Sequence, residues 1–389
     1  MYSMTRFSQL LKLFPKSSFQ QAVKKHKADH YVKNFKSWDL LVTMLYGQIT
    51  QTRSLRRLVD GFNSHSHNHY HLGTGTCKRS TISESLSKRS VEPFKQVCDL
   101  LLNQASKKHK RECKNLISII DSTPIRLSGH GYEWTEGWKN RKEQGLKIHV
   151  ELNQQNNCPS YANITASNVI DITDAKANIK IQKGTTYVMD KAYIDYNWWH
   201  EINQKQAYFV TRRKSNTGYK VTKELDNNND QDIKSDQVIE FKYKHSGVKR
   251  INKYYGQPLR LVTVYRPDKK PMALITNDFN RSASEIAKLY KDRWQIELFF
   301  KWIKQKLKLK TYFGRSENAV KIQIYCALIA FLLMKKLINQ TKNWPKMIEL
   351  QTWLKHGLFV RDSINTDYYK RRQEKQKLIK RLQTTLEFP

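Results

Sequence analysis

The spacing of apolar residues changes twice along this chain, and the two changes divide it into three parts. Up to about residue 105, apolar residues recur every three or four positions, as in residues 37–49, which is typical of amphipathic helices. Short apolar runs of strand length follow between residues 116 and 276, and helical spacing returns over residues 284–338. These patterns predict a mixed α/β protein whose strand-rich part lies between two helical parts.

The middle part contains a series of candidate strands. They are residues 116–120, 147–152, 169–172, 186–189, 208–211, 238–243, 259–265 and 272–276. A helical stretch is expected over residues 193–202, and the charged residues 107–114 are expected to form a linker. The polar residues 214–236 predict an excursion or mobile loop.

The chain carries a large excess of positive charge. Lysine and arginine number 70 and aspartate and glutamate number 34, which gives a formal net charge of +36. A polyanion would neutralise this charge, so nucleic acid is the favoured partner and an anionic membrane surface is the second choice. The membrane is less favoured because the longest apolar run, Tyr325–Met334, is too short to span a bilayer and predicts a buried helix.

Two further features favour a cytoplasmic protein. The N-terminal run Met1–Leu13 has charged residues among scattered apolar ones and does not have the pattern of a signal peptide. The five cysteines are widely spaced and include no CxxC pair. This spacing predicts reduced thiols, with neither a disulfide framework nor a zinc knuckle.

Residues 1–105 are expected to form an all-helical domain that binds DNA. Its short helices have basic residues near their ends, among them Lys78, Arg79, Lys88 and Arg89, and resemble a helix-turn-helix docking surface. A solvated basic face explains the same residues about as well, so the sequence leaves both interpretations open.

Two aspartates follow apolar strand candidates. Asp121 comes directly after the run LISII, and Asp190 comes directly after TYVM. Side chains at strand ends of α/β sheets often line clefts, where catalytic groups gather. A single aspartate at such a position is usually a cap or a turn residue, so the argument depends on a third acid.

The third acid is Glu297, in a helical stretch rich in charged residues. At about 100° per residue, Tyr290, Arg293, Glu297 and Lys304 lie on one narrow helical face. Three acids could hold two metal ions for phosphodiester cleavage, and the basic residues could contact phosphate oxygens. The alternative is an ordinary amphipathic helix with a charged outer face.

At these residues the chain resembles a known family. The spacing Tyr290-x2-Arg293-x3-Glu297-x6-Lys304 is similar to the YREK signature of the DDE transposases of bacterial IS4-type insertion sequences. Residues 120–124 (IDSTP) resemble the family's first-aspartate block, and residues 190–195 (DKAYID) resemble its second. Residues 7–58 are similar to the N-terminal domain of one branch of this family. The resemblance covers roughly residues 5–340.

The resemblance implies a fold and a metal site. It implies an RNase H-like catalytic core over residues 106–340, with a β-rich insertion at about 197–283 and a basic helical tail at 341–389. It further implies that Asp121, Asp190 and Glu297 are the catalytic, metal-binding triad. Two Mg²⁺ ions would be the cofactor, with Mn²⁺ as a substitute.

The resemblance also implies a reaction and partners. The reaction would be cut-and-paste transposition through a hairpin, by a cytoplasmic homodimer in a synaptic complex. The partners would be double-stranded DNA at the terminal inverted repeats and at the target. The residues expected to contact DNA are Tyr290, Arg293, Lys304, Lys301 and Arg212.

Several alternatives stay open. Trp198 and Trp199 could stack on a flipped base, although core packing is favoured. The alternating histidines of residues 65–71 could bind a metal, although a loop without metal is favoured. The lysines of residues 301–310 could contact phosphates or be solvated. The whole chain could instead be a non-catalytic DNA-binding protein, such as a transposase relic, or a two-metal nuclease that cuts without joining.

Overall fold

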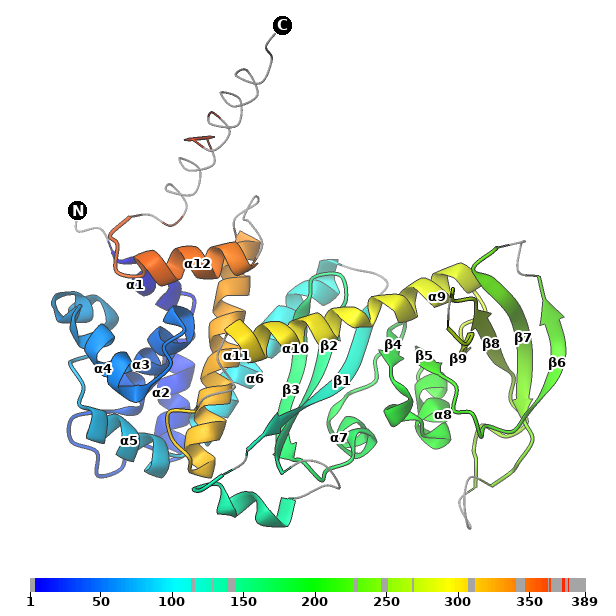
Figure 1. Cartoon of the computed structure of the whole chain (residues 1–389), viewed down its shortest axis with the longest axis horizontal. Helices are drawn as coiled ribbons and strands as arrows, with labels where there is room; N and C mark the ends of the chain where they lie inside the picture. The colour runs from blue at the N-terminus through cyan, green and yellow to red at the C-terminus, as the bar shows by residue number, and fades with distance from the viewer. Residues whose placement is uncertain are drawn as a thin grey trace, which may run out of the picture. The chain divides into compact units, whose positions relative to one another are not determined.

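The computed structural model describes residues 4–112, 116–127, 129–138, 144–226, 230–245, 251–267, 269–306, 312–340, 347–362, 364, 373–374 and 377. The chain divides into two compact units (Figure 1). The first unit combines Met1–Leu101 with Trp302–Pro389, and the second is Leu102–Lys301. Residues 302–340 therefore group with the N-terminal helices. This division differs from the expected one, in which they belonged to the part from 106 to 340.

The first unit is helical, as the apolar spacing predicts. Its elements are α1 (Arg6–Leu11), α2 (Lys16–Lys25), α3 (Ser37–Thr50), α4 (Leu55–Asn63), the 3-10 helix η1 (Ser66–Leu72), α5 (Arg79–Lys88), the start of α6 (Glu92–Glu112), the end of α10 (Trp294–Lys306), α11 (Glu317–Gln340) and α12 (Met347–Gly357). Helix α11 packs on α1, α3, α5 and α12. Gly47 lets α3 and α4 approach closely, because a Cβ at that position would lie 2.8 Å from a Leu58 methyl.

Helix α11 contains the longest apolar run of the chain. By length and composition it could cross a membrane, but 78% of the relevant window is buried inside the protein. The expectation of a buried helix for Tyr325–Met334 is confirmed. Apolar contact with neighbouring helices accounts for the run without a membrane.

The second unit is built on one mixed sheet of nine described strands, in the order β3-β2-β1-β4-β5-β9-β8-β7-β6 (Figure 1). Strands β1, β4 and β5 are parallel to one another, whereas the other neighbours pair antiparallel. The strands are β1 (Ile117–Arg126), β2 (Gly145–Asn153), β3 (Cys158–Ala166), β4 (Thr186–Met189), β5 (Tyr208–Arg212), β6 (Tyr219–Leu225), β7 (Ile233–Phe241), β8 (Leu259–Val264) and β9 (Met272–Thr276).

Helices pack on this sheet and bury its apolar side chains. They are η2 (Glu133–Trp138), α7 (Asp171–Asn178), η3 (Lys191–Tyr193), α8 (Tyr196–Gln204), α9 (Ala283–Asp292) and the first part of α10. Trp198 and Trp199 of α8 are fully buried in the core, and the ring of Trp199 stacks on Phe209 at 4.7 Å between centroids. Core packing of these two tryptophans is therefore confirmed, and neither is exposed to a flipped base.

Three local expectations are wrong. Residues 169–172 were expected to be a strand, but α7 begins at Asp171, whose charge favours a helix N-terminus. The expected linker at 107–114 is helical as far as Glu112, since α6 continues through it. The polar stretch 214–236 contains β6 and the start of β7. Strand β6 is a mostly exposed edge strand, and its apolar alternation covers only Tyr219 to Thr222 before the register shifts after Val221.

The basic tail expected at residues 341–389 lies largely outside the described residues. Of that range the structure describes α12 and a few residues around it.

Candidate active site

Two of the three expected acids lie side by side at the centre of the sheet. The parallel pairing of β1 with β4 sets Ile120 opposite Met189. The next residues are Asp121 and Asp190, so the register brings their backbones together. Asp190 directly follows β4, as expected, but Asp121 lies within β1, because β1 continues to Arg126 by pairing with β2. Strand β1 pairs with β4 only as far as Ile120 but with β2 as far as Arg126, so the apolar run alone predicts the end of the strand too early.

The third acid reaches Asp121 through an arginine. Arg293, between α9 and α10, donates from Nη1 to Asp121 Oδ2 at 2.9 Å. Its Nη2 donates to Glu297 Oε1 at 2.6 Å, one turn further along α10. All three side chains are partly shielded from water, so these charged contacts are stronger than surface ion pairs. One guanidinium thus holds two of the three expected acids.

The surroundings raise the pKa of Asp121 to about 6. Burial is the main cause, and the backbone N–H of Ser122 and the charge of Arg293 oppose it. The negative charges of Asp190 and Glu297 raise the pKa further. The charges of Asp190 and Glu297 therefore act on Asp121, in a region that also contains Arg293.

Tyr290 approaches the other aspartate. Its hydroxyl donates to Asp190 Oδ1 at 3.4 Å, and its ring lies 5.8 Å from the Arg293 guanidinium carbon. Burial and the charge of Asp190 raise the pKa of Tyr290 to about 12, while Arg293 and Arg212 act in the opposite direction. The tyrosine hydroxyl consequently stays protonated at neutral pH and acts as a hydrogen-bond donor, and Arg212 at the end of β5 belongs to the same neighbourhood.

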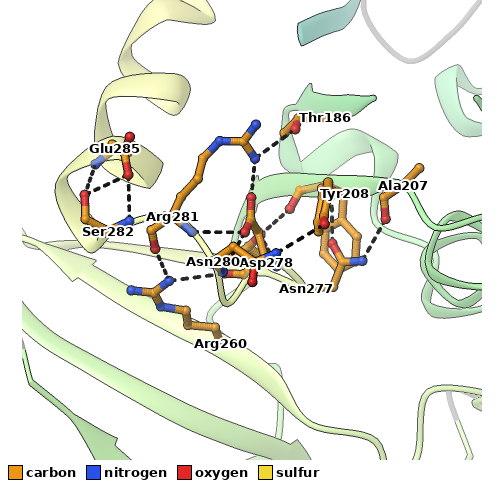
Figure 2. Close-up of polar contacts among 12 residues, drawn as sticks. Thr186, Ala207, Tyr208, Arg260, Asn277, Asp278, Asn280, Arg281, Ser282 and Glu285 are labelled. Atoms are coloured by element: carbon orange, nitrogen blue, oxygen red, sulfur yellow. Dashed lines mark hydrogen bonds and ion pairs between the residues drawn. The ribbon is translucent and has the colours of Figure 1, made fainter. Parts of the chain in front are cut away.

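A polar junction between β9 and α9 fixes the helix that carries Tyr290 (Figure 2). Arg260 of β8 donates to both carboxylate oxygens of buried Asp236, at 2.9 and 2.6 Å, and to the Asp278 carbonyl at 3.2 Å. The Asp278 side chain is fully buried and pairs with Arg281. These contacts lock the turn that leads into α9.

The first turn of α9 is capped reciprocally (Figure 2). Ser282 N donates to Glu285 Oε2 at 2.8 Å, and Glu285 N donates to Ser282 Oγ at 3.2 Å. This capping box satisfies backbone groups that would otherwise lack partners at a helix start. Together with the junction, it gives Tyr290 and Arg293 a rigid support.

A buried polar network lies on the opposite face of β1. Ser122 N donates to Asp121 Oδ1 at 2.8 Å, while its hydroxyl donates to Asp171 Oδ1 at 2.8 Å. Asp171 also accepts from Lys147 Nζ at 2.9 Å. Burial lowers the pKa of His149 next to this pair, despite nearby carboxylates. This network was not predicted from the sequence, because the apolar residues around Asp171 are typical of a strand.

Two expected DNA contacts lie further along α10. Lys301 is exposed, and Lys304 is half-buried in the segment that groups with the first unit. Residues 307–311, which include further lysines of the same run, lie outside the described residues. The structure thus brings Tyr290, Arg293 and Arg212 to the acids, whereas the role of Lys301 and Lys304 stays a prediction.

No three His, Cys, Asp or Glu side chains among the described residues are grouped so that they could hold a metal ion together. At the three acids, Arg293 pairs with two carboxylates and supplies the positive charge. The histidines of residues 65–71 lie mostly in η1, a short helix rather than the expected loop. There His69 is buried, with Nε2 3.0 Å from the Phe62 carbonyl.

Comparison with known proteins gives a consistent result. The chain matches the family model described as the transposase DDE domain over residues 112–333, and a model described as a domain of unknown function (DUF4372) over residues 3–75. A protein of Sinorhizobium fredii described as a transposase, y4zB, is 37% identical over 258 residues, which are 65% of this chain and 70% of that protein.

Two further relatives are described as transposases of insertion sequences. The one for element IS5377 of Geobacillus stearothermophilus is 25% identical over 272 residues, which are 68% of each chain. The one for element IS4SA of a Synechocystis strain is 26% identical over 285 residues, which are 71% of this chain and 76% of that protein.

Proposed function

The chain belongs to the DDE transposases of insertion sequences, and the IS4 family fits these comparisons. From this premise we propose that it moves DNA by cut-and-paste transposition. It would cleave phosphodiester bonds at the terminal inverted repeats of its element and join the ends to a target. The match over residues 112–333 contains all three acids, which supports an active-site role for them.

The proposed catalytic residues are Asp121, Asp190 and Glu297. The observations that support this assignment are the parallel pairing of β1 with β4, which sets Asp121 next to Asp190, and Arg293, which pairs with both Asp121 and Glu297. The order β3-β2-β1-β4-β5 supports an RNase H-like core, in which three antiparallel strands are followed by two parallel ones. Strands β6 to β9 then correspond to the expected β-rich insertion.

DDE transposases generally use divalent metal ions, and the residues present fit Mg²⁺ by their chemistry. Carboxylate oxygens are the ligands that Mg²⁺ prefers, and Asp121, Asp190 and Glu297 would hold it. Burial raises the pKa of Asp121, and the charges of Asp190 and Glu297 add to this, so a bound cation would stabilise its ionised form. A bound pair of ions would activate an attacking oxygen and stabilise a leaving oxygen.

The basic and hydroxyl groups around the acids would position the DNA backbone. Arg293 would hold a phosphate oxygen, Tyr290 would donate a hydrogen bond from its hydroxyl, and Arg212 would add positive charge at the end of β5. Lys301 and Lys304 would extend this contact along α10. The helical residues 1–105 would bind the element's ends, and two copies would act together in a cytoplasmic synaptic complex.

One experiment separates this function from its rivals. The purified chain is incubated with Mg²⁺ and labelled DNA that carries the sequences flanking its gene. A transposase produces cut ends and joined strand-transfer products. A nuclease would give cut ends alone, and a non-catalytic DNA-binding protein would bind the DNA and leave it intact.

A further inference from the structure

A groove on the first unit lies outside the active site described above. One side is the loop of residues 27–35, and the other is the face of α5 that carries Thr81, Glu84 and Lys88. The volume of the groove is about 690 Å³. It is called the Tyr31 groove below, after the side chain at the tip of its loop.

One buried arginine holds this loop through hydrogen bonds near both of its ends. Arg89, whose side chain is 5% exposed, donates to the carbonyls of Ala28 and Phe35 at 2.9 and 2.7 Å, and to Asp29 Oδ1 at 2.9 Å. Asp29 also accepts hydrogen bonds from the backbone N–H and hydroxyl of Ser37 at 2.8 and 2.7 Å. Both ends of the loop are therefore fixed, and its shape is set before any partner binds.

The tip of this braced loop presents an aromatic ring to solvent. Tyr31 is 93% exposed, and its ring contacts the His30 ring at 3.9 Å between centroids. Tyr31 and Lys27 both have left-handed backbone conformations, with φ of 59° and 48°. Such conformations are unfavourable for residues with side chains, and strain of this kind is often kept where it serves binding.

The surroundings of the groove are positively charged. Lys24, Lys25, Lys27 and Lys33 are exposed, and none of them forms an ion pair among the residues that the structure describes. The nearby acids are already neutralised, since Asp29 pairs with Arg89 and Glu84 pairs with Lys88 at 2.7 Å. The groove therefore keeps a net positive charge next to an exposed aromatic ring.

We propose that the Tyr31 groove binds double-stranded DNA. The lysines contact phosphates of both backbone strands, and the Tyr31 ring enters the minor groove, where apolar and aromatic side chains pack against sugars and base edges. An acidic protein could also satisfy the lysines, but the formal net charge of +36 on the whole chain favours nucleic acid. The proposal rests on the proposed function, because it names the surface through which the helical unit holds DNA.

The test is equilibrium binding of the full chain to a short fluorescent duplex over a series of salt concentrations. All proteins carry Asp121→Asn so that the duplex is not cut. Lys27→Ala with Lys33→Ala removes two phosphate contacts and should reduce the slope of log K against log salt by about 2. Tyr31→Ala should weaken binding by about tenfold with little change in slope, while Tyr31→Phe should bind like the parent.

The matched control is Lys355→Ala, which removes an exposed lysine of α12 away from the groove. A slope for the double variant no smaller than the control's, or parental binding by Tyr31→Ala, would overturn the proposal. A 5-iodouracil duplex gives a direct check, because its photoproduct should map to the peptide that contains Tyr31. The cleavage assay uses the parent protein and is separate from the binding assay. If the parent does not cleave DNA but the groove variants change DNA binding as predicted, only the proposed function is refuted.

Discussion

Arg293 lies between the proposed catalytic acids, with its Nη1 2.9 Å from Asp121 Oδ2. The same guanidinium donates to Glu297 at 2.6 Å, so it uses carboxylate oxygens that a metal ion would also need. The acids raise the pKa of Arg293 against the effect of burial, which would lower it. At the proposed site, arginine and metal ion would thus compete for the same two carboxylates.

Arg293→Ala should change the metal dependence of cleavage in two ways. The concentration of Mg²⁺ for half-maximal rate should fall, because a competing cation is removed. The maximal rate should fall by about ten- to a hundredfold, because a charge-assisted phosphate contact is lost. Single-turnover cleavage over a range of Mg²⁺ measures both. Lys291→Ala is the control, an exposed lysine in the last turn of α9. If the cleavage rates of both variants depend on Mg²⁺ concentration in the same way, Arg293 does not compete with the metal.

Asp121→Asn should stabilise the metal-free protein at neutral pH. Because the folded state holds the pKa of this carboxyl at about 6, against 3.8 when unperturbed, ionisation costs folding free energy as pH rises from about 4 to about 6. The full effect corresponds to about 3 kcal/mol above pH 6 and disappears near pH 4. Denaturation midpoints of parent and variant in EDTA over this range measure it. If the difference between the two midpoints does not grow with pH, the pKa of Asp121 is not raised in the folded state.

Ser122→Ala should slow cleavage by about tenfold. The change keeps the backbone N–H that holds Asp121 but removes the hydroxyl contact to Asp171. We expect the Asp121 side chain to be less well oriented, which raises the activation free energy of cleavage by about the free energy of one hydrogen bond. The matched control is Ser118→Ala near the start of the same strand, which removes a similar hydroxyl contact, to Glu151 instead of Asp171. Equal rates for the two variants would show that the network behind β1 does not position Asp121.

Tyr290→Phe should reduce the cleavage rate several-fold and leave its pH dependence unchanged between pH 7 and about 10. The pKa of Tyr290 is raised to about 12, so its hydroxyl stays protonated over this range and acts only as a donor. The measurement is the rate against pH for parent and variant. If the variant lost a limb of the parental profile in this range, Tyr290 would be a proton-transfer group.

The contact between Arg293 and Glu297 could be predicted from sequence because helix geometry fixes spacing, but the single helix expected to carry Tyr290 to Lys304 is two helices, since α9 ends at Asp292 and α10 begins at Trp294. Arg293 and Glu297 are four residues apart, and they meet one turn apart in the structure. The pairing of Asp121 with Asp190 was harder to foresee, since register depends on which strands are neighbours. The apolar run before Asp121 does not predict that β1 continues past this residue, because the pairing with β2 decides the length of the strand.

The remaining errors have a physical cause in common. Residues 169–172 have the apolar run of a strand and residues 214–236 have the polarity of a loop, but the structure of both depends on tertiary neighbours. Lys147 and Ser122 become partners of Asp171 only after the sheet has formed. The Tyr31 groove could not be predicted either, since Arg89 reaches its loop from a distant part of the sequence.

The most direct test of the account is single-turnover cleavage of a labelled element end in Mg²⁺ by Asp121→Asn, Asp190→Asn and Glu297→Gln. Glu201→Gln, an exposed acid of α8, is the control. The account predicts that the three variants bind the end but cut it at least a thousandfold more slowly, roughly the loss of metal-assisted stabilisation, while the control cuts at the parental rate. Parental cleavage by any of the three would contradict the proposed catalytic site.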